Sequence, residues 1–141
     1  VLFLISDKMK SILKYNGLTG WNTFEIKLLD KAGSEIESYY GFSVNGKSGS
    51  ISCSKSIAIE KKLATNGPLK KYYKGLYIEP QSWDGSDFFL ADNYFGIIIS
   101  SKAAKVIESH FLTNIVLINL TDAQFDEQTV EILKKKTVNS K

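Results

Sequence analysis

Two segments of the 141-residue chain, offset by 94 positions (5 to 99 and 19 to 113), follow one pattern of residue types. In each, an apolar run ends at a serine, apolar side chains at helical spacing follow, and a Leu-Thr pair closes the segment. Serine is a preferred residue at a helix N-cap. The pattern therefore predicts two strand–helix units, with helices that begin after Ser6 and Ser100 and end near Tyr15 and His110. Internal duplication and the common grammar of strand–helix units both explain the repeat.

The rest of the chain alternates short apolar runs with turn signals, which is the pattern of strands. Further helices are expected from Asp126 onward, with Val130 and Leu133 on the apolar face, and at residues 56–63. The turn at residues 83–87 is expected to deliver the aromatic run 88–90 into the core. The elements predict an α+β fold, a mixed or antiparallel sheet with two or three helices packed on it. Strands are expected at residues 1–5, 21–28, 36–44, 50–53, 75–79, 97–99 and 115–120, with turns at 30–33 and 45–46.

Length and composition indicate a single α+β domain over residues 1–141. The apolar fraction of 43% and the eight Phe, seven Tyr and two Trp are too high for a disordered chain. Much of the formal charge of +3 comes from lysines at 134–136 and 141, and we expect residues 135–141 to form a flexible tail. The chain begins inside an apparent strand and without Met, so we expect that it lacks an N-terminal segment. Arg, the side chain that reads guanine best, is absent, which disfavours nucleic-acid binding.

Cysteine use indicates a reducing compartment. Cys53 is the only cysteine, so the chain can form neither an intrachain disulfide nor a zinc site built from several thiolates. The apolar run at residues 1–5 is too short for a signal peptide or a membrane span. We therefore expect a cytoplasmic protein that does not enter the membrane.

Residues 41–48 match the phosphate-binding P-loop motif G-x-x-x-x-G-K-[ST]. A P-loop needs a helix that opens at the lysine, so that backbone N–H groups converge on phosphate. Here the positions between the two glycines alternate apolar and polar like a strand, and strand-like residues follow Lys47 and Ser48. We therefore expect a hairpin at this match, which would bind no nucleotide.

No other set of residues indicates catalysis. His110 is the only histidine, and its place near a helix end favours a role in neutralising that end. Cys53 is interpreted as a small core residue. Asp84 and Asp87 could share a proton or bind a cation, but capping of the turn beside Gly85 is the simpler explanation. We therefore expect a protein that is not an enzyme, with no metal site and no cofactor.

Several motifs, in a fixed order, resemble a family of bacterial immunity proteins from polymorphic toxin systems, many of whose members are uncharacterised. The resemblance extends from about residue 5 to residue 120, and its best element is the W-D-G-S-D-F-F block followed by a buried strand and a Ser-capped helix. It implies a cytoplasmic protein that neutralises a toxin by binding it, without catalysis. Immunity proteins against nucleases are often acidic, so the mild basicity of this chain fits poorly and leaves the toxin's chemistry open. The matching segments are Gly17-Leu18-Thr19-Gly20-Trp21, Tyr39-Tyr40-Gly41, Ile51, Lys55-Ser56, Gly75-Leu76-Tyr77, residues 83–89, residues 98–102 and Leu112-Thr113-Asn114.

Two functions from different classes follow. The first is a toxin-binding immunity protein whose partner is the cognate toxin. Its expected contact residues are Trp21, Trp83, Asp84 and Asp87, because Trp is enriched among residues that carry binding energy and a neighbouring acid can pair with a basic partner. The alternative is a small-molecule-binding or hydrolytic protein that uses the turn at residues 83–87.

Overall fold

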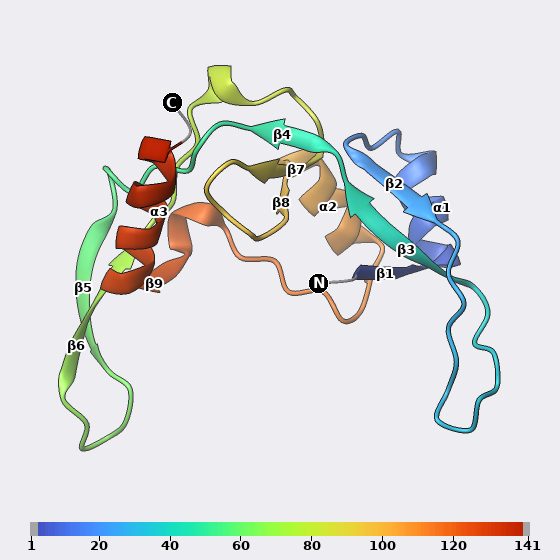
Figure 1. The fold of residues 1–141 in the computed structure, drawn as a ribbon, viewed down its shortest axis with the longest axis horizontal. Helices are drawn as coiled ribbons and strands as arrows, with labels where there is room; N and C mark the ends of the chain where they lie inside the picture. Colours follow the sequence, from blue (N-terminus) through green and yellow to red (C-terminus); the bar gives the residue numbers. More distant parts are fainter. Residues whose placement is uncertain (1–2, 140–141) are drawn as a thin grey trace. The chain divides into compact units, whose positions relative to one another are not determined.

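The computed structural model describes residues 3–139, which fall into two compact units (Figure 1). Unit 1 comprises Val1–Lys47, Asp84–Leu90 and Gly96–Ile115, and unit 2 comprises Ser48–Trp83, Ala91–Phe95 and Val116–Lys141. Three small sheets have the strand orders β1-β3-β2, β4-β7-β8 and β5-β6-β9. The predicted α+β class is confirmed.

The strands are β1 (Phe3–Ser6), β2 (Trp21–Phe24), β3 (Tyr39–Val44), β4 (Gly46–Ser48), β5 (Ile57–Lys62), β6 (Leu69–Lys74), β7 (Phe88–Ala91), β8 (Ile98–Ile99) and β9 (Gln124–Asp126). The helices are α1 (Asp7–Tyr15), α2 (Ser101–Ser109) and α3 (Glu127–Asn139), with 3-10 turns η1 (Pro80–Ser82) and η2 (Leu120–Asp122).

Both predicted Ser-capped helices of unit 1 are confirmed. The Ser6 hydroxyl accepts a hydrogen bond from the Met9 N–H at 3.2 Å, and the Ser100 hydroxyl accepts one from the Ala103 N–H at 3.1 Å. These bonds satisfy N–H groups that lack a partner inside the helix. The α1 and α2 ranges are related by the same 94-residue offset, from Asp7 to Ser101 and from Tyr15 to Ser109.

The correspondence continues past the helix ends. The residue two positions after each helix has a left-handed backbone, with φ of 61° at Gly17 and 50° at Phe111. The backbone N–H of Asn16 donates to Ile12 O at 3.1 Å, and that of His110 donates to Val106 O at 3.2 Å. A left-handed residue just after a helix is a common way to end it. The repeated sequence pattern therefore describes two structurally equivalent strand–helix–turn segments.

The core of unit 1 lies between these helices and the β1-β3-β2 sheet. Strand β1 pairs antiparallel with β3, with Phe3 opposite Phe42, and β2 pairs with β3, with Trp21 opposite Val44. The predicted hairpin of the second and third strands is present. Its regular pairing joins residues 21–24 to residues 41–44, and residues 25–38 form a long loop between the two strands. The buried core residues are Ile5, Leu13, Leu18, Phe42, Phe88, Ala103 and Ile107.

The prediction of a turn at residues 45–46 is wrong. The chain leaves β3 and continues into β4, which belongs to a different sheet and borders β7. A Cβ atom on Gly46 would lie 2.0 Å from the Ser86 Oγ and 2.2 Å from the Phe88 carbonyl oxygen. Gly46 is therefore needed for close approach of the backbone rather than for a hairpin turn.

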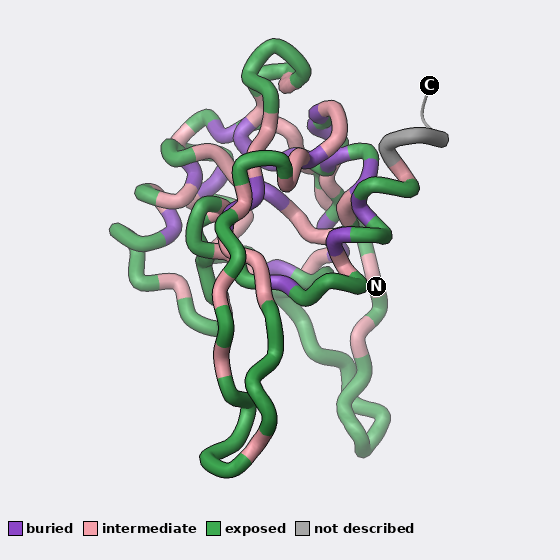
Figure 2. Tube along the Cα trace, turned by 90° about the vertical axis from the view of Figure 1, so that its left-hand side faces the viewer, coloured by how far each residue is buried: buried purple, intermediate pink, exposed green. Residues whose placement is uncertain are grey.

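Unit 2 departs most from the predicted elements. Residues 56–63 were expected to be helical, but Ile57–Lys62 forms strand β5, which pairs antiparallel with β6. Strands expected at 50–53 and 75–79 meet only in one bridge between Ser52 and Tyr77. The β5–β6 hairpin, which faces the viewer in Figure 2, is exposed or half-buried over its whole length.

The end of unit 2 contains one wrong and one confirmed prediction. Residues 115–119 form no strand, and Val116 and Ile118 are 86% and 68% exposed, so the predicted buried strand is wrong. The last helix is confirmed: the Asp126 carboxylate caps it by accepting from the Thr129 N–H at 2.8 Å, and Val130 and Leu133 are buried. Residues 135–139, part of the stretch expected as a tail, belong to α3, and 140–141 lie outside the described residues.

Candidate functional site

The turn predicted at residues 83–87 is present, and Asp84 organises it. One carboxylate oxygen of Asp84 accepts from the Lys47 N–H at 2.8 Å, and the other accepts from the Ser86 N–H at 2.9 Å and from the Ser86 hydroxyl. The bonds from Ser86 and Lys47 hold the pKa of the Asp84 carboxyl below its usual value. Gly85 has a φ of 84°, a conformation that favours glycine. The exposed Asp84 side chain thus uses both of its oxygens within the fold.

Asp87 connects the two strand–helix segments of unit 1. One carboxylate oxygen accepts from the Ser100 hydroxyl at 2.7 Å, and the other accepts from the Thr19 N–H at 3.0 Å and lies 3.7 Å from the Lys102 Nζ. Burial acts to raise the pKa of this carboxyl, but the bonds from Ser100 and Thr19 and the charge of Lys102 outweigh it and lower the pKa. Asp87 is therefore an ionised structural crosslink with an exposed fraction of 6%.

The two tryptophans occupy different units. Trp21 is half-buried in unit 1, where its indole N–H donates to the Leu18 carbonyl at 2.8 Å and its ring stacks on Phe42. Trp83 belongs to unit 2, is half-buried and directly follows η1. The structure thus brings Asp84 and Asp87 together in one turn and gives Trp21 a place in the packing of unit 1. Of the four predicted contact residues, Asp84 is exposed, the two tryptophans are half-buried and Asp87 is buried.

The P-loop match at residues 41–48 follows β3 and β4, and no helix opens at Lys47. Both glycines of the match have packing roles. A Cβ atom on Gly41 would meet the Phe24 ring at 2.2 Å, and Gly46 lies against β7 as described above. Strand geometry directs successive N–H groups to opposite sides, so they cannot converge on one phosphate.

We expect Lys47→Ala to leave the protein's folding and its binding properties almost unchanged. The Lys47 side chain is exposed, and the substitution should change the free energy of unfolding by less than about 0.5 kcal/mol. Thermal unfolding and titration with ATP check this expectation. Saturable micromolar ATP binding that disappears in the variant would contradict it.

The lone histidine and cysteine have ordinary surroundings. The His110 Nδ1 lies 2.8 Å from the Val106 carbonyl oxygen at the end of α2, the position expected from the sequence. Cys53 is half-buried and unpaired. Among residues 3–139, no group of three or more His, Cys, Asp or Glu side chains is placed to hold a metal ion.

The chain matches no protein-family model, no curated protein and no solved structure. A candidate site therefore has to be built from the residues themselves. No helix in the described part of the chain combines the length and apolar character needed to cross a membrane. Among the described residues, the three-stranded sheet of unit 2 presents one surface for such a site.

One face of the β5-β6-β9 sheet combines apolar, aromatic and basic side chains. Directly opposite residues of an antiparallel pair share a face, and successive residues alternate between faces. The registers place Ile57 opposite Lys74, Ile59 opposite Tyr72 and Lys61 opposite Lys70. We call the surface formed by these six residues, together with Gln124 and Asp126 of β9, the tyrosine–lysine face.

Several contacts order this face. The Lys61 Nζ lies 4.3 Å from the centre of the Tyr72 ring and donates to the Gln124 side-chain oxygen at 2.9 Å. The Lys74 Nζ forms an ion pair with Asp122 at 2.8 Å. Cation–π contacts and ion pairs of this kind hold long side chains in fewer rotamers. The basic groups of the face are thus partly fixed before anything binds.

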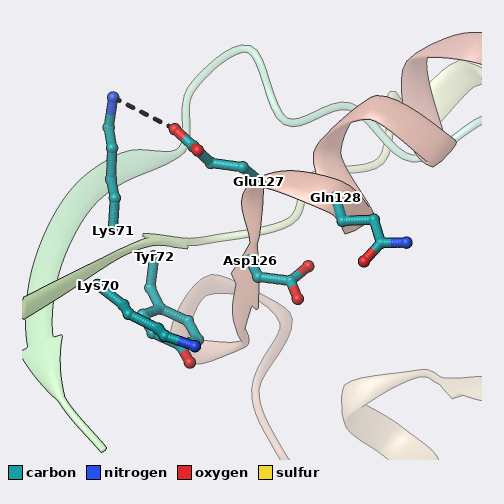
Figure 3. A pocket seen from close by; sticks show the side chains of 6 residues that line it. All are labelled: Lys70, Lys71, Tyr72, Asp126, Glu127 and Gln128. Carbon is teal, nitrogen blue, oxygen red and sulfur yellow. Dashed lines mark ion pairs between the residues drawn. The ribbon is translucent and has the colours of Figure 1, made fainter. Parts of the chain in front are cut away.

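A shallow depression lies where β6 meets the start of α3 (Figure 3). Figure 3 shows Lys71 reaching to Glu127 on one side of β6, with an Nζ–Oε1 distance of 3.8 Å, whereas Lys70 and Tyr72 point to the other side. The hydrogen bonds from Thr129 and the charge of Lys70 lower the pKa of the Asp126 carboxyl. The depression is lined by Lys70, Lys71, Tyr72, Asp126, Glu127 and Gln128.

The positive charge of the protein is concentrated in unit 2. Unit 1 contains eight Lys and eight Asp or Glu residues, whereas unit 2 contains ten Lys and seven Asp or Glu residues. Residues 55–74 alone contain six Lys and one Glu. The formal charge of +3 therefore belongs to unit 2, and the β5–β6 hairpin contributes a large part of the positive charge.

Sequence reasoning missed the tyrosine–lysine face. A helix over residues 56–63, as predicted, would place Ile59 on the side opposite Ile57 and Lys61. Their alternate spacing, followed by the run Lys70-Lys71-Tyr72-Tyr73-Lys74, was a signal for two paired strands. Recognising that hairpin would have brought the lysines and the tyrosine together.

Proposed function

We propose that this protein is a non-catalytic binding protein whose partner is another protein, and that it acts as an immunity protein against a cognate bacterial toxin. The observation that carries the proposal is the β5–β6 hairpin. On it, Ile57, Leu63 and Leu69 are 65%, 64% and 60% exposed, and Ile57 shares a face with Tyr72 and with lysines of both strands. Exposed apolar and aromatic side chains with charged neighbours are typical of a protein-binding surface.

A toxin as the partner is suggested by the sequence resemblance, and the roles of the resembling residues in the structure bear on which residues would contact it. In the W-D-G-S-D-F-F block, Asp84 and Gly85 form the turn, Asp87 crosslinks unit 1, and Phe88 and Phe89 are buried. A block of this kind maintains a fold, so its resemblance supports a shared fold more than a shared contact surface. We therefore propose that the toxin-contacting residues include residues outside the block.

The alternative of a ligand-binding or hydrolytic turn at residues 83–87 receives less support. The carboxylate oxygens of Asp84 and Asp87 already accept hydrogen bonds from the protein. A ligand would have to replace these bonds and would destabilise the turn in doing so. We therefore propose that the protein acts by binding another protein, in the cytoplasm of the toxin-producing bacterium.

Co-expression with the toxin candidate encoded next to this protein's gene tests the proposal. We expect growth to be rescued and a complex to co-purify. A catalytically inactive toxin variant controls for expression burden. Failure to rescue growth against any neighbouring toxin, or turnover of a small substrate by the purified chain, would count against the proposed function.

The same assay tests the surface residues of the predicted site. Trp83→Ala and Asp84→Ala are compared after thermal unfolding has established which variants are folded. Loss of rescue in a folded variant would make that residue a contact. Because Asp84 caps the turn, we expect Asp84→Ala to lower the free energy of unfolding by about 1 kcal/mol and to retain rescue at permissive temperature.

A further inference from the structure

We infer that the tyrosine–lysine face is the docking surface and that the partner presents carboxylates to it. This inference rests on the proposed protein-binding function and names the chemistry of the partner. It starts from two lysines of the hairpin. Lys61 and Lys70 are direct cross-strand partners on one face of the sheet. Positive groups gathered on one face attract carboxylates.

Carboxylates of a partner can pair with the ammonium groups of Lys61 and Lys70. No acidic residue lies directly opposite either lysine in the β5–β6 pairing, since each faces the other. On the opposite face of the same hairpin, by contrast, Glu60 and Lys71 are cross-strand partners of opposite charge. The tyrosine–lysine face therefore offers the ammonium groups of Lys61 and Lys70 to carboxylates of the partner, whereas Lys71 on the other face is matched by Glu60.

The surroundings of the lysine pair favour a protein over a nucleic acid. The exposed Ile57 and the half-buried Ile59 and Tyr72 share the face and offer apolar area to a protein side chain. Asp126 also lies on the face, and Asp122 pairs with Lys74 beside it. These carboxylates would repel a phosphate backbone, which carries only negative charge, whereas a protein surface can match both signs.

The face is also preorganised for binding. Lys61 is held against Tyr72 and Gln124, so fixing its ammonium group on binding costs less conformational entropy. Strand β5 is an edge strand of its sheet, so nothing on the outer side of the sheet extends this surface within the order β5-β6-β9. Ile57 and Lys70 on this face are exposed, and the excess charge of unit 2 will accelerate the association of an acidic partner at low salt.

Lys70→Glu gives a test in which binding should fall while stability changes little. The variant places a carboxylate opposite Lys61 but removes the positive charge that acts on Asp126, so the melting temperature should change by only about a few degrees. The affinity for the co-expressed toxin should fall about tenfold or more, because a like charge now meets the partner's carboxylates. Lys8→Glu is the matched control, since it makes the same charge change at an exposed residue of α1.

A second probe makes the result independent of the toxin. Poly-L-glutamate is titrated into the purified full-length chain, and the backbone amide shifts are followed by NMR. We expect shifts centred on Lys61, Lys70 and Tyr72, and several-fold weaker binding in Lys70→Glu but not in Lys8→Glu. Binding of poly-L-glutamate at this face without growth rescue against any toxin would support the face as a docking surface and would reject a toxin as the partner.

The outcomes that overturn the inference are equally specific. A folded Lys70→Glu variant that binds the toxin as tightly as the wild type would reject the tyrosine–lysine face as the docking surface and would leave the proposed function intact. Absence of poly-L-glutamate binding, or shifts centred on another surface, would also reject it. Tighter binding of a single-stranded thymidine oligonucleotide than of poly-L-glutamate, through the same lysines, would identify a nucleic-acid surface instead.

Discussion

Phe88→Ala is expected to lower the free energy of unfolding by about 3 to 5 kcal/mol, the usual cost of deleting a large buried ring. Phe88 is 3% exposed and packs edge-on against Phe42, with ring centres 5.6 Å apart. It contacts a cluster that includes residues of both α1 and α2, so the cavity would open at the centre of unit 1. Urea and thermal unfolding measure the loss, with a fall in melting temperature on the order of 10 °C.

The same strand provides the control for Phe88. Leu90 lies in β7 but is 38% exposed, so Leu90→Ala removes a similar apolar side chain from a much less enclosed position. We expect a loss below about 1.5 kcal/mol for Leu90→Ala. If Phe88→Ala instead kept the wild-type melting temperature and lost only partner binding, Phe88 would be a contact residue and not a core residue.

The parts of the fold that could be predicted are those set by local signals. Ser6 and Ser100 mark helix starts because a hydroxyl side chain satisfies N–H groups of the first turn, whatever packs around it. The turn at residues 83–87 follows similarly, since Asp84 supplies oxygens and Gly85 accepts a positive φ. Each of these signals acts over three or four residues, so tertiary context changes it little.

The errors arise where distant pairing decides the structure. Residues 57–62 contain two β-branched residues and three charged ones, a composition that suits an exposed helix or a strand. Pairing with β6 determines that they form a strand. Asn45 and Gly46 resemble a hairpin turn, but Gly46 serves close packing beside Ser86 and Phe88. Neither partner can be identified from the residues next to it in sequence.

The same contrast between local signals and distant pairing applies to the candidate site. The sequence singled out Trp21, Trp83, Asp84 and Asp87 because aromatic and acidic side chains near turns are frequent contact residues. Local structure uses most of their polar groups, as the carbonyl bonded to Trp21 and the donors around Asp84 illustrate. The tyrosine–lysine face exists only once β5, β6 and β9 are in register, which no local signal specifies.

Asp87→Asn is expected to lower the free energy of unfolding at neutral pH by about 2 to 3 kcal/mol, because it leaves buried donors without an acceptor. Both carboxylate oxygens face donors: one accepts from the Ser100 hydroxyl, and the other accepts from the Thr19 N–H and pairs with Lys102. An asparagine must turn its NH₂ group toward one of these sides, where it meets a donor. Asp92→Asn makes the same chemical change at an exposed residue and should have little effect.

The pH dependence of this difference distinguishes a charged crosslink from simple packing. The pKa of the Asp87 carboxyl is lowered in the folded protein, so the unfolded chain takes up a proton first as the pH falls. The stability that Asp87 contributes is therefore complete above the ordinary carboxyl pKa and is lost as the pH falls through the folded-state value. Urea unfolding from neutral to acidic pH should show the wild type and Asp87→Asn converging in stability. A difference that stays constant over this range would mean that the charge of Asp87 does not stabilise the fold.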